Sequence, residues 1–93
     1  DITKITFLKN SWEFEFSLKN IIKYGYIKYI SEKGSLAING ISLTVANLLK
    51  DTFNVSVIPH TYEFTNLSIL KEGDMVNIEF DSLARYMIGK YDK

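Results

Sequence analysis

Apolar and polar side chains alternate along several short stretches of this chain, and that alternation restricts the folds it can adopt. The alternation runs through residues 4–7, 12–16 and 52–57, and it returns near the end at Val76, Ile78 and Phe80. A repeat of two residues is typical of β-strands that bury one face and expose the other. We therefore expect a protein built mainly from half-buried strands, and its 13 aromatic residues favour the same structure.

Turn-forming residues separate these stretches and delimit further strands. Lys9-Asn10-Ser11 predicts a hairpin turn, and Asn39-Gly40 is a strong two-residue turn signal. That second turn joins predicted strands at Ser35–Ile38 and Ile41–Leu49. We expect Pro59 to end the strand before it or to lie on a sheet edge, because proline cannot donate a hydrogen bond to a strand ladder. Further turns are predicted at Lys50-Asp51 and at residues 71–74.

Two stretches depart from the alternation and indicate helices. Between residues 18 and 33 the apolar residues approximate a 3.6-residue period, but Gly25 interrupts them. We predict a loop or short turn there, followed by a helix near residues 25–32 that Gly34 ends. Residues 60–70 form a connection that can hold one helical turn. A terminal helix capped by Asp81 or Ser82 carries Leu83, Ala84, Tyr86, Met87 and Ile88.

These elements predict an all-β fold. The expected architecture is a six-stranded antiparallel Greek-key barrel, closed or nearly closed, with one or two short helices and a C-terminal helix. Closing a sheet into a barrel removes exposed strand edges, although periodicity alone leaves a two-sheet sandwich as an alternative. A chain of 93 residues has room for one domain with a modest core, so the prediction is a single domain over residues 1–93.

Composition and charge exclude several classes of function. Lys plus Arg equal Asp plus Glu at 11 each, and this balance argues against a protein that binds the phosphate backbone of nucleic acids. The absence of cysteine excludes disulfides, thiolate catalysis and zinc–thiolate sites, and the single His60 cannot form a histidine metal cluster alone. No apolar run reaches the roughly 20 residues of a membrane span, so we expect no membrane partner and a cytoplasmic location.

The remaining candidates for chemistry are polar residues beside predicted strand ends. Ser42 and Thr44 lie two residues apart, so both hydroxyls face the same side of a strand. Each hydroxyl can donate or accept a hydrogen bond, which suits the alternating donors and acceptors of a heterocyclic amide edge. The alternative is that both decorate the solvent face of an amphipathic strand. The full set is Lys33, Asn39, Ser42, Thr44, His60, Thr61, Glu63 and Asp81.

The order of these residues resembles the pattern of a known family. Residues 33–45, Lys-Gly-Ser-Leu-Ala-Ile-Asn-Gly-Ile-Ser-Leu-Thr-Val, closely resemble the central motif of the lumazine-binding domains of riboflavin synthase. Tyr29-Ile30 before this motif and a helix beginning near Leu83 are similar to the second, C-terminal repeat of that family. Three further blocks follow the family pattern in the same order: residues 58–63 with Thr65, Gly73-Asp74, and residues 76–81.

The chain also departs from the family pattern. The repeat usually begins with a Gly-His-containing strand that would precede Asp1, and Asp1 itself is not a Met. We therefore expect this chain to be part of a longer protein and to lack the first strand of its repeat. Asn39 stands where the family often has Asp, which puts any charge role of that position in doubt.

The resemblance implies a fold, a ligand and a reaction. It implies a six-stranded Greek-key barrel that binds 6,7-dimethyl-8-ribityllumazine without a metal or other cofactor. One lumazine gives a four-carbon unit to another, which yields riboflavin and a ribitylaminopyrimidinedione. In the family this occurs between the N-terminal barrel of one subunit and the C-terminal barrel of a neighbour in a homotrimer. The alternatives are a non-catalytic lumazine or flavin carrier of the same fold and a β-barrel interaction module without a ligand.

The resemblance also assigns the site residues. Ser42, Leu43 and Thr44 form one substrate-binding stretch, in which the two hydroxyls bond the substrate. Ile58, Pro59, His60, Thr61, Tyr62 and Glu63 wrap the ring, with Ile58 on its face and Thr61 at its polar edge. Lys33 reaches the ribityl hydroxyls or a ring carbonyl. The catalytic candidates are Ser42 and Asp81, the latter as a proton acceptor or polar positioner at the subunit interface.

Each assignment has a structural alternative. Lys33 suits a solvated helix end, where cations are favoured, and residues 58–63 suit a plain turn that ends a strand. Asp81 suits a helix N-cap. His60 has the side chain whose ordinary pKa lies nearest neutrality, but its position tolerates other residues in the family. We therefore interpret His60 as a loop residue and leave the general base unassigned.

Overall fold

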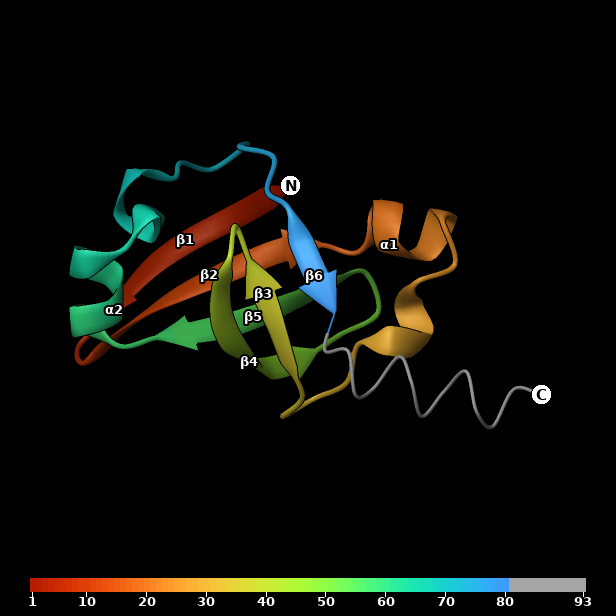
Figure 1. Cartoon of the computed structure of the whole chain (residues 1–93), viewed down its shortest axis with the longest axis horizontal. Coiled ribbons are helices and arrows are strands. Elements are labelled where there is room, and N and C mark those ends of the chain that lie inside the picture. The colour runs from red at the N-terminus through yellow and green to blue at the C-terminus, as the bar shows by residue number, and fades with distance from the viewer. Residues whose placement is uncertain (81–93) are drawn as a thin grey trace.

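The first two strands form a hairpin that supplies one wall of the fold. In the computed structural model, which describes residues 1–80, β1 (Ile2–Leu8) pairs with β2 (Ser11–Ser17) around a turn at Lys9 and Asn10 (Figure 1). Trp12, Phe14 and Phe16 alternate along β2, and the latter two are buried. The predicted hairpin is confirmed.

The remaining strands continue the same antiparallel sheet. Two hairpins join β3 (Ser35–Ile38), β4 (Ile41–Leu48) and β5 (Thr52–Val57), and β6 (Ile78–Phe80) pairs with β3. The strand order is β1-β2-β5-β4-β3-β6. Because β2 lies beside β5 after a long connection, strands β2 to β5 form a Greek key. The all-β, six-stranded antiparallel prediction is confirmed.

The two edge strands of this sheet meet at one point. The amide of Ile2 donates to the carbonyl of Asp74 at 2.9 Å, and the amide of Gly73 donates to the carbonyl of Ile2 at 2.8 Å. These bonds connect the start of β1 to the turn before β6. Within residues 1–80 no strand register joins β1 to β6, so the sheet is bridged at Ile2 rather than closed along its length.

The predicted helix near residues 25–32 is wrong in position. The helix α1 (Lys19–Lys23) ends before Gly25, and a separate 3-10 turn, η1 (Ile27–Tyr29), follows it. Gly25 adopts φ +79°, which breaks a right-handed helix, and the amide of Tyr26 donates to the carbonyl of Ile21 at 2.9 Å. The apolar period survives in part, since Ile21 and Ile30 are both buried.

The connection after β5 holds two short helical segments, α2 (Pro59–Phe64) and η2 (Asn66–Ile69). Pro59 opens α2, where its fixed φ and missing amide hydrogen are tolerated. Leu67 of η2 is buried in the core. This agrees with the predicted connection over residues 60–70, although it contains more helix than one turn.

The core lies between the hairpin of β1 and β2 and the strands β3 to β5. Phe14, Phe16 and Phe53 are fully buried, and the rings of Phe16 and Phe53 lie 5.1 Å apart. Leu36, Ile38, Leu43 and Val45 complete the opposite wall. Among residues 1–80 no helix is long and apolar enough to cross a membrane. The predicted terminal helix, with Asp81 or Ser82 as its cap, lies outside the described residues.

Candidate functional site

The strand β4 presents its polar residues on the outer face of the sheet. Leu43 and Val45 are buried, whereas Ser42 and Thr44, which alternate with them, are exposed. The alternation of side chains along a strand explains this division. Both hydroxyls therefore face the same side, as predicted. Leu43, which the sequence placed in the same binding stretch, points into the core and supports the strand from behind.

The neighbouring strand β3 extends this outer face. Ser35 lies opposite Thr44, and Ala37 lies opposite Ser42. Residues directly opposite each other in an antiparallel pair share a face of the sheet. Ser35 is exposed like Thr44. The result is a strip of small side chains and hydroxyls across two strands.

The strand β4 changes partners halfway along its length. Its register with β5 covers Val45, Asn47 and Leu48, with an irregularity between Val45 and Asn47. Residues 41–44 pair with β3 instead, and Figure 1 shows β4 curving away from β5 in this part. Ser42 and Thr44 thus lie where the wall of the sheet bends, and bulges of this kind redirect the side chains near them.

The end of β5 lies on the same side of the sheet. Val55 and Val57 are buried, so Ser56 and Ile58 face outward. The side chain of Ile58 is 60% exposed. An exposed isoleucine at the end of β5, the strand that pairs with residues 45–48 of β4, provides an apolar surface against which a flat ring can pack.

The segment from Ile58 to Glu63 is folded into α2. The amide of Tyr62 donates to the carbonyl of Ile58 at 3.0 Å, and the hydroxyl of Thr65 donates to the carbonyl of Thr61 at 2.6 Å. Thr61 is half-buried, and Glu63 is exposed. His60 is exposed, and its ring lies 4.7 Å from that of Phe64. These contacts make the segment a short helix rather than a plain turn.

Tyr62 differs from its neighbours because its ring anchors α2 to β2. It stacks on Trp12, with centroids 4.0 Å apart and an angle of 8° between the rings, and it also contacts Phe14. Stacked aromatic pairs contribute about 0.5–1.5 kcal/mol beyond the area they bury. In this arrangement Tyr62 holds the segment in place, and Ile58 remains on the surface.

Lys33 lies at the end of the polar strip. Its amide donates to the carbonyl of Val45 at 2.8 Å, and the amide of Val45 donates to the carbonyl of Gly34 at 2.9 Å. Lys33 adopts φ +66° in a turn, so it is not the end of a helix. Its side chain is exposed beside the row that holds Ser35 and Thr44.

Asn39 has a structural role in the turn between β3 and β4. Its φ of +50° is a conformation that asparagine tolerates better than most residues. Its side-chain oxygen accepts from the amide of Asn77 at 2.7 Å, and its own amide donates to the carbonyl of Asn77 at 2.8 Å. Asn39 therefore ties the turn to the start of β6, and aspartate could accept the same bond.

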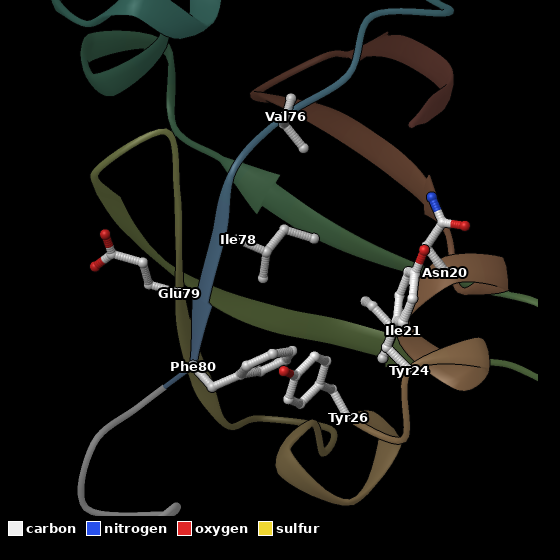
Figure 2. Close-up of a pocket in the computed structure, with 8 residues that line it drawn as sticks. All are labelled: Asn20, Ile21, Tyr24, Tyr26, Val76, Ile78, Glu79 and Phe80. Carbon is white, nitrogen blue, oxygen red and sulfur yellow. The ribbon is translucent and has the colours of Figure 1, made fainter.

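Two hollows lie beside β6, and Glu79 and Phe80 line both of them. A small one of about 130 Å³ is lined by Ser35, Ala37, Ser42, Glu79 and their neighbours Leu36 and Phe80. A larger one of about 540 Å³ separates β6 from α1 (Figure 2). The sequence pattern does not predict the larger hollow, although Tyr24 and Tyr26, which line it, flank Gly25. Neither hollow includes a residue of the 58–63 segment.

The structure leaves part of the predicted site exposed to solvent. Ser42, Thr44, Ile58 and Lys33 are exposed along β4 and its two neighbours, while Leu43 and Tyr62 point inward. Asp81 lies outside the described residues. Within residues 1–80, no group of three or more histidine or acidic residues is arranged to hold a metal ion. The roles of the individual residues in binding stay predictions.

This chain matches one family of domains and several known proteins. The family described as "Lumazine binding domain" matches residues 1–81. Riboflavin synthase of Actinobacillus pleuropneumoniae is 49% identical over 61 residues, which cover 66% of this chain and 28% of that protein. Riboflavin synthase of Buchnera aphidicola is 38% identical over 88 residues, 95% of this chain and 41% of that protein. The chain thus spans less than half the length of these relatives.

Proposed function

Because this chain belongs to the lumazine-binding domain family, we propose that it binds 6,7-dimethyl-8-ribityllumazine as one domain of a riboflavin synthase. Its relatives at 38–49% identity carry that enzyme name. The proposed whole protein is a transferase of riboflavin biosynthesis, a homotrimer, and cytoplasmic. These last properties rest on the family resemblance.

One observation carries the proposal. The hydroxyls of Ser42 and Thr44 stand together on the outer face of β4, and the exposed Ile58 lies at the end of the neighbouring strand β5. The hydroxyls match a ring edge that carries both donors and acceptors. Ile58 offers an apolar surface for the face of the same ring. A planar bicyclic amide with a polar edge needs both kinds of contact.

The reaction makes a further demand on the protein. One lumazine must transfer a four-carbon unit to a second, so two ligands must be held face to face. Holding two reactants in a productive orientation can contribute roughly 7–11 kcal/mol to catalysis. In this proposal Ser42 orients one ligand, and Asp81 accepts or positions a proton near the interface with a second domain. This chain supplies one of the two binding surfaces.

Fluorescence titration with riboflavin, the reaction product, tests this proposal. We expect the folded chain to bind riboflavin and Ser42→Ala to bind it about fivefold more weakly, because one net hydrogen bond contributes about 1 kcal/mol. Thr52→Val is the matched control, since it removes a strand hydroxyl at the opposite end of β5. A folded chain that does not bind riboflavin at high micromolar concentration would refute the proposal. An unchanged affinity in Ser42→Ala would remove Ser42 from the site.

A further inference from the structure

The outer-face row that contains Ser42 continues onto β6. Ala37 lies opposite Ser42 on β4 and opposite Glu79 on β6. Residues in register across an antiparallel sheet share a face, so Ser42, Ala37 and Glu79 form one row. Figure 2 shows the side chain of Glu79 leaving β6 on the opposite side from Ile78 and Phe80. Adjacent strands lie about 4.8 Å apart, which puts Ser42 and Glu79 about 10 Å apart at the backbone.

The centre of this row is hollow. The side chain of Ala37 is a single methyl group, and Ala37, Ser42 and Glu79 line the hollow of about 130 Å³. Glu79 is exposed, and its side chain makes no hydrogen bond or ion pair with another residue of the described part of the chain. Glu79 thus lines the space beside Ser42, and its carboxylate oxygens accept no hydrogen bond from residues 1–80.

We propose that Glu79 is a further ligand-binding residue of this site, and that its carboxylate accepts hydrogen bonds from the hydroxyls of the ribityl chain. This inference rests on the proposed function, since it takes the ligand to be a ribityl-bearing heterocycle. An ionised carboxylate is an acceptor only, so it attracts the hydroxyl donors of a polyol and repels the carbonyl oxygens of the ring. Glu79 therefore selects for the chain that the ring carries.

The position of Lys33 supports the same orientation of the ligand. Its ammonium group is a donor only, and Lys33 is an exposed residue just before β3, whereas Ala37 and Glu79 pair farther along that strand. A ring carbonyl suits the lysine, and the hydroxyl-bearing chain suits the glutamate. In this proposal, Lys33 and Glu79 offer opposite charges to the two ends of one ligand.

Binding of two flavins that differ only in the ribityl chain distinguishes contacts with that chain from contacts with the ring. Riboflavin carries the chain, and lumiflavin has the same ring system with a methyl group in its place. We expect Glu79→Gln to weaken riboflavin binding about fivefold and to leave lumiflavin binding unchanged, because a charged acceptor bonds about twice as strongly as a neutral one. Asp51→Asn, in the turn between β4 and β5, removes the same charge away from the site and should change neither affinity.

The outcomes distinguish this inference from the proposed function. If Glu79→Gln weakens the binding of both flavins equally, or weakens neither, the proposed role of Glu79 is wrong. The proposed binding site still stands in that case, provided that the unmodified chain binds riboflavin. Failure of the unmodified, folded chain to bind riboflavin overturns both. Thermal unfolding followed by circular dichroism verifies the fold of each variant, and the exposed position of Glu79 makes a folding defect unexpected.

Discussion

Single residues in this chain divide into those that shape the sheet and those that the sheet presents to solvent. Leu43 and Val45 are buried beneath β4, and the hydroxyls between them face outward. This division needed only the two-residue repeat of a strand, so it could be predicted from the sequence. The inward direction of the Tyr62 side chain could not be predicted from the sequence, because it depends on a stack with Trp12, which is distant in sequence and adjacent in space.

Asn39 provides a residue-scale prediction about stability. Asn39→Ala should lower the free energy of unfolding by about 1–2 kcal/mol, because alanine loses the bond to the Asn77 amide and tolerates a positive φ poorly. Asn39→Asp keeps a hydrogen-bond acceptor and also tolerates a positive φ, so its free energy of unfolding should stay near that of the unmodified chain. Urea unfolding measures both. Equal losses in the two variants would show that the side-chain bond to Asn77 is not the cause.

At the scale of elements, the position of α1 shows where pattern reasoning failed. The apolar residues between 18 and 30 have a helical period, and the sequence alone favoured a helix after Gly25. Gly25 instead adopts φ +79° and closes a helix that lies before it. Glycine both interrupts helices and ends them, and only the tertiary burial of Ile21 and Leu18 decides which side becomes the helix.

The docking of α2 on β2 provides an element-scale prediction. Tyr62→Ala should destabilise the fold by about 2 kcal/mol and weaken riboflavin binding, because α2 then loses its stack on Trp12 and Ile58 is no longer held in place. Tyr62→Phe keeps the aromatic ring, so it should retain both the stability of the fold and the affinity for riboflavin. Trp12 is the single tryptophan, so its fluorescence reports the stack directly.

The matched phenylalanine variant decides between two roles of Tyr62. If Tyr62→Phe keeps the fold but loses riboflavin affinity as much as Tyr62→Ala, the hydroxyl contacts the ligand. That result would contradict the anchoring role. Destabilisation without any change in riboflavin binding would show that α2 does not position Ile58.

At the scale of the whole molecule, the chain carries one lumazine-binding domain and spans less than half of its relatives. The proposed reaction needs two ligands face to face, and one domain presents one surface. We expect the chain to bind lumazine but to form riboflavin slowly at low concentration, with a rate that rises as the square of protein concentration if two copies meet. Riboflavin fluorescence against time, over a dilution series, measures this.

Sedimentation of the same samples provides the control for that experiment. A constant rate per molecule in samples that sediment as monomers would contradict the need for two surfaces. A rate that follows the dimer population would support the proposal.

The sequence by itself determined most of the strands, most of the turns and the outward direction of Ser42 and Thr44. The last strand is shorter than its alternation predicted, because Val76 precedes β6 (Ile78–Phe80). The alternation of strands and the residue preferences of turns involve residues a few positions apart, so both can be recognised in the amino-acid sequence. Only the tertiary structure decided the strand order, which brings Glu79 of β6 into one row with Ala37 and Ser42, and the anchoring of Tyr62. Those contacts join residues far apart in sequence, and a local pattern does not specify which strands become neighbours.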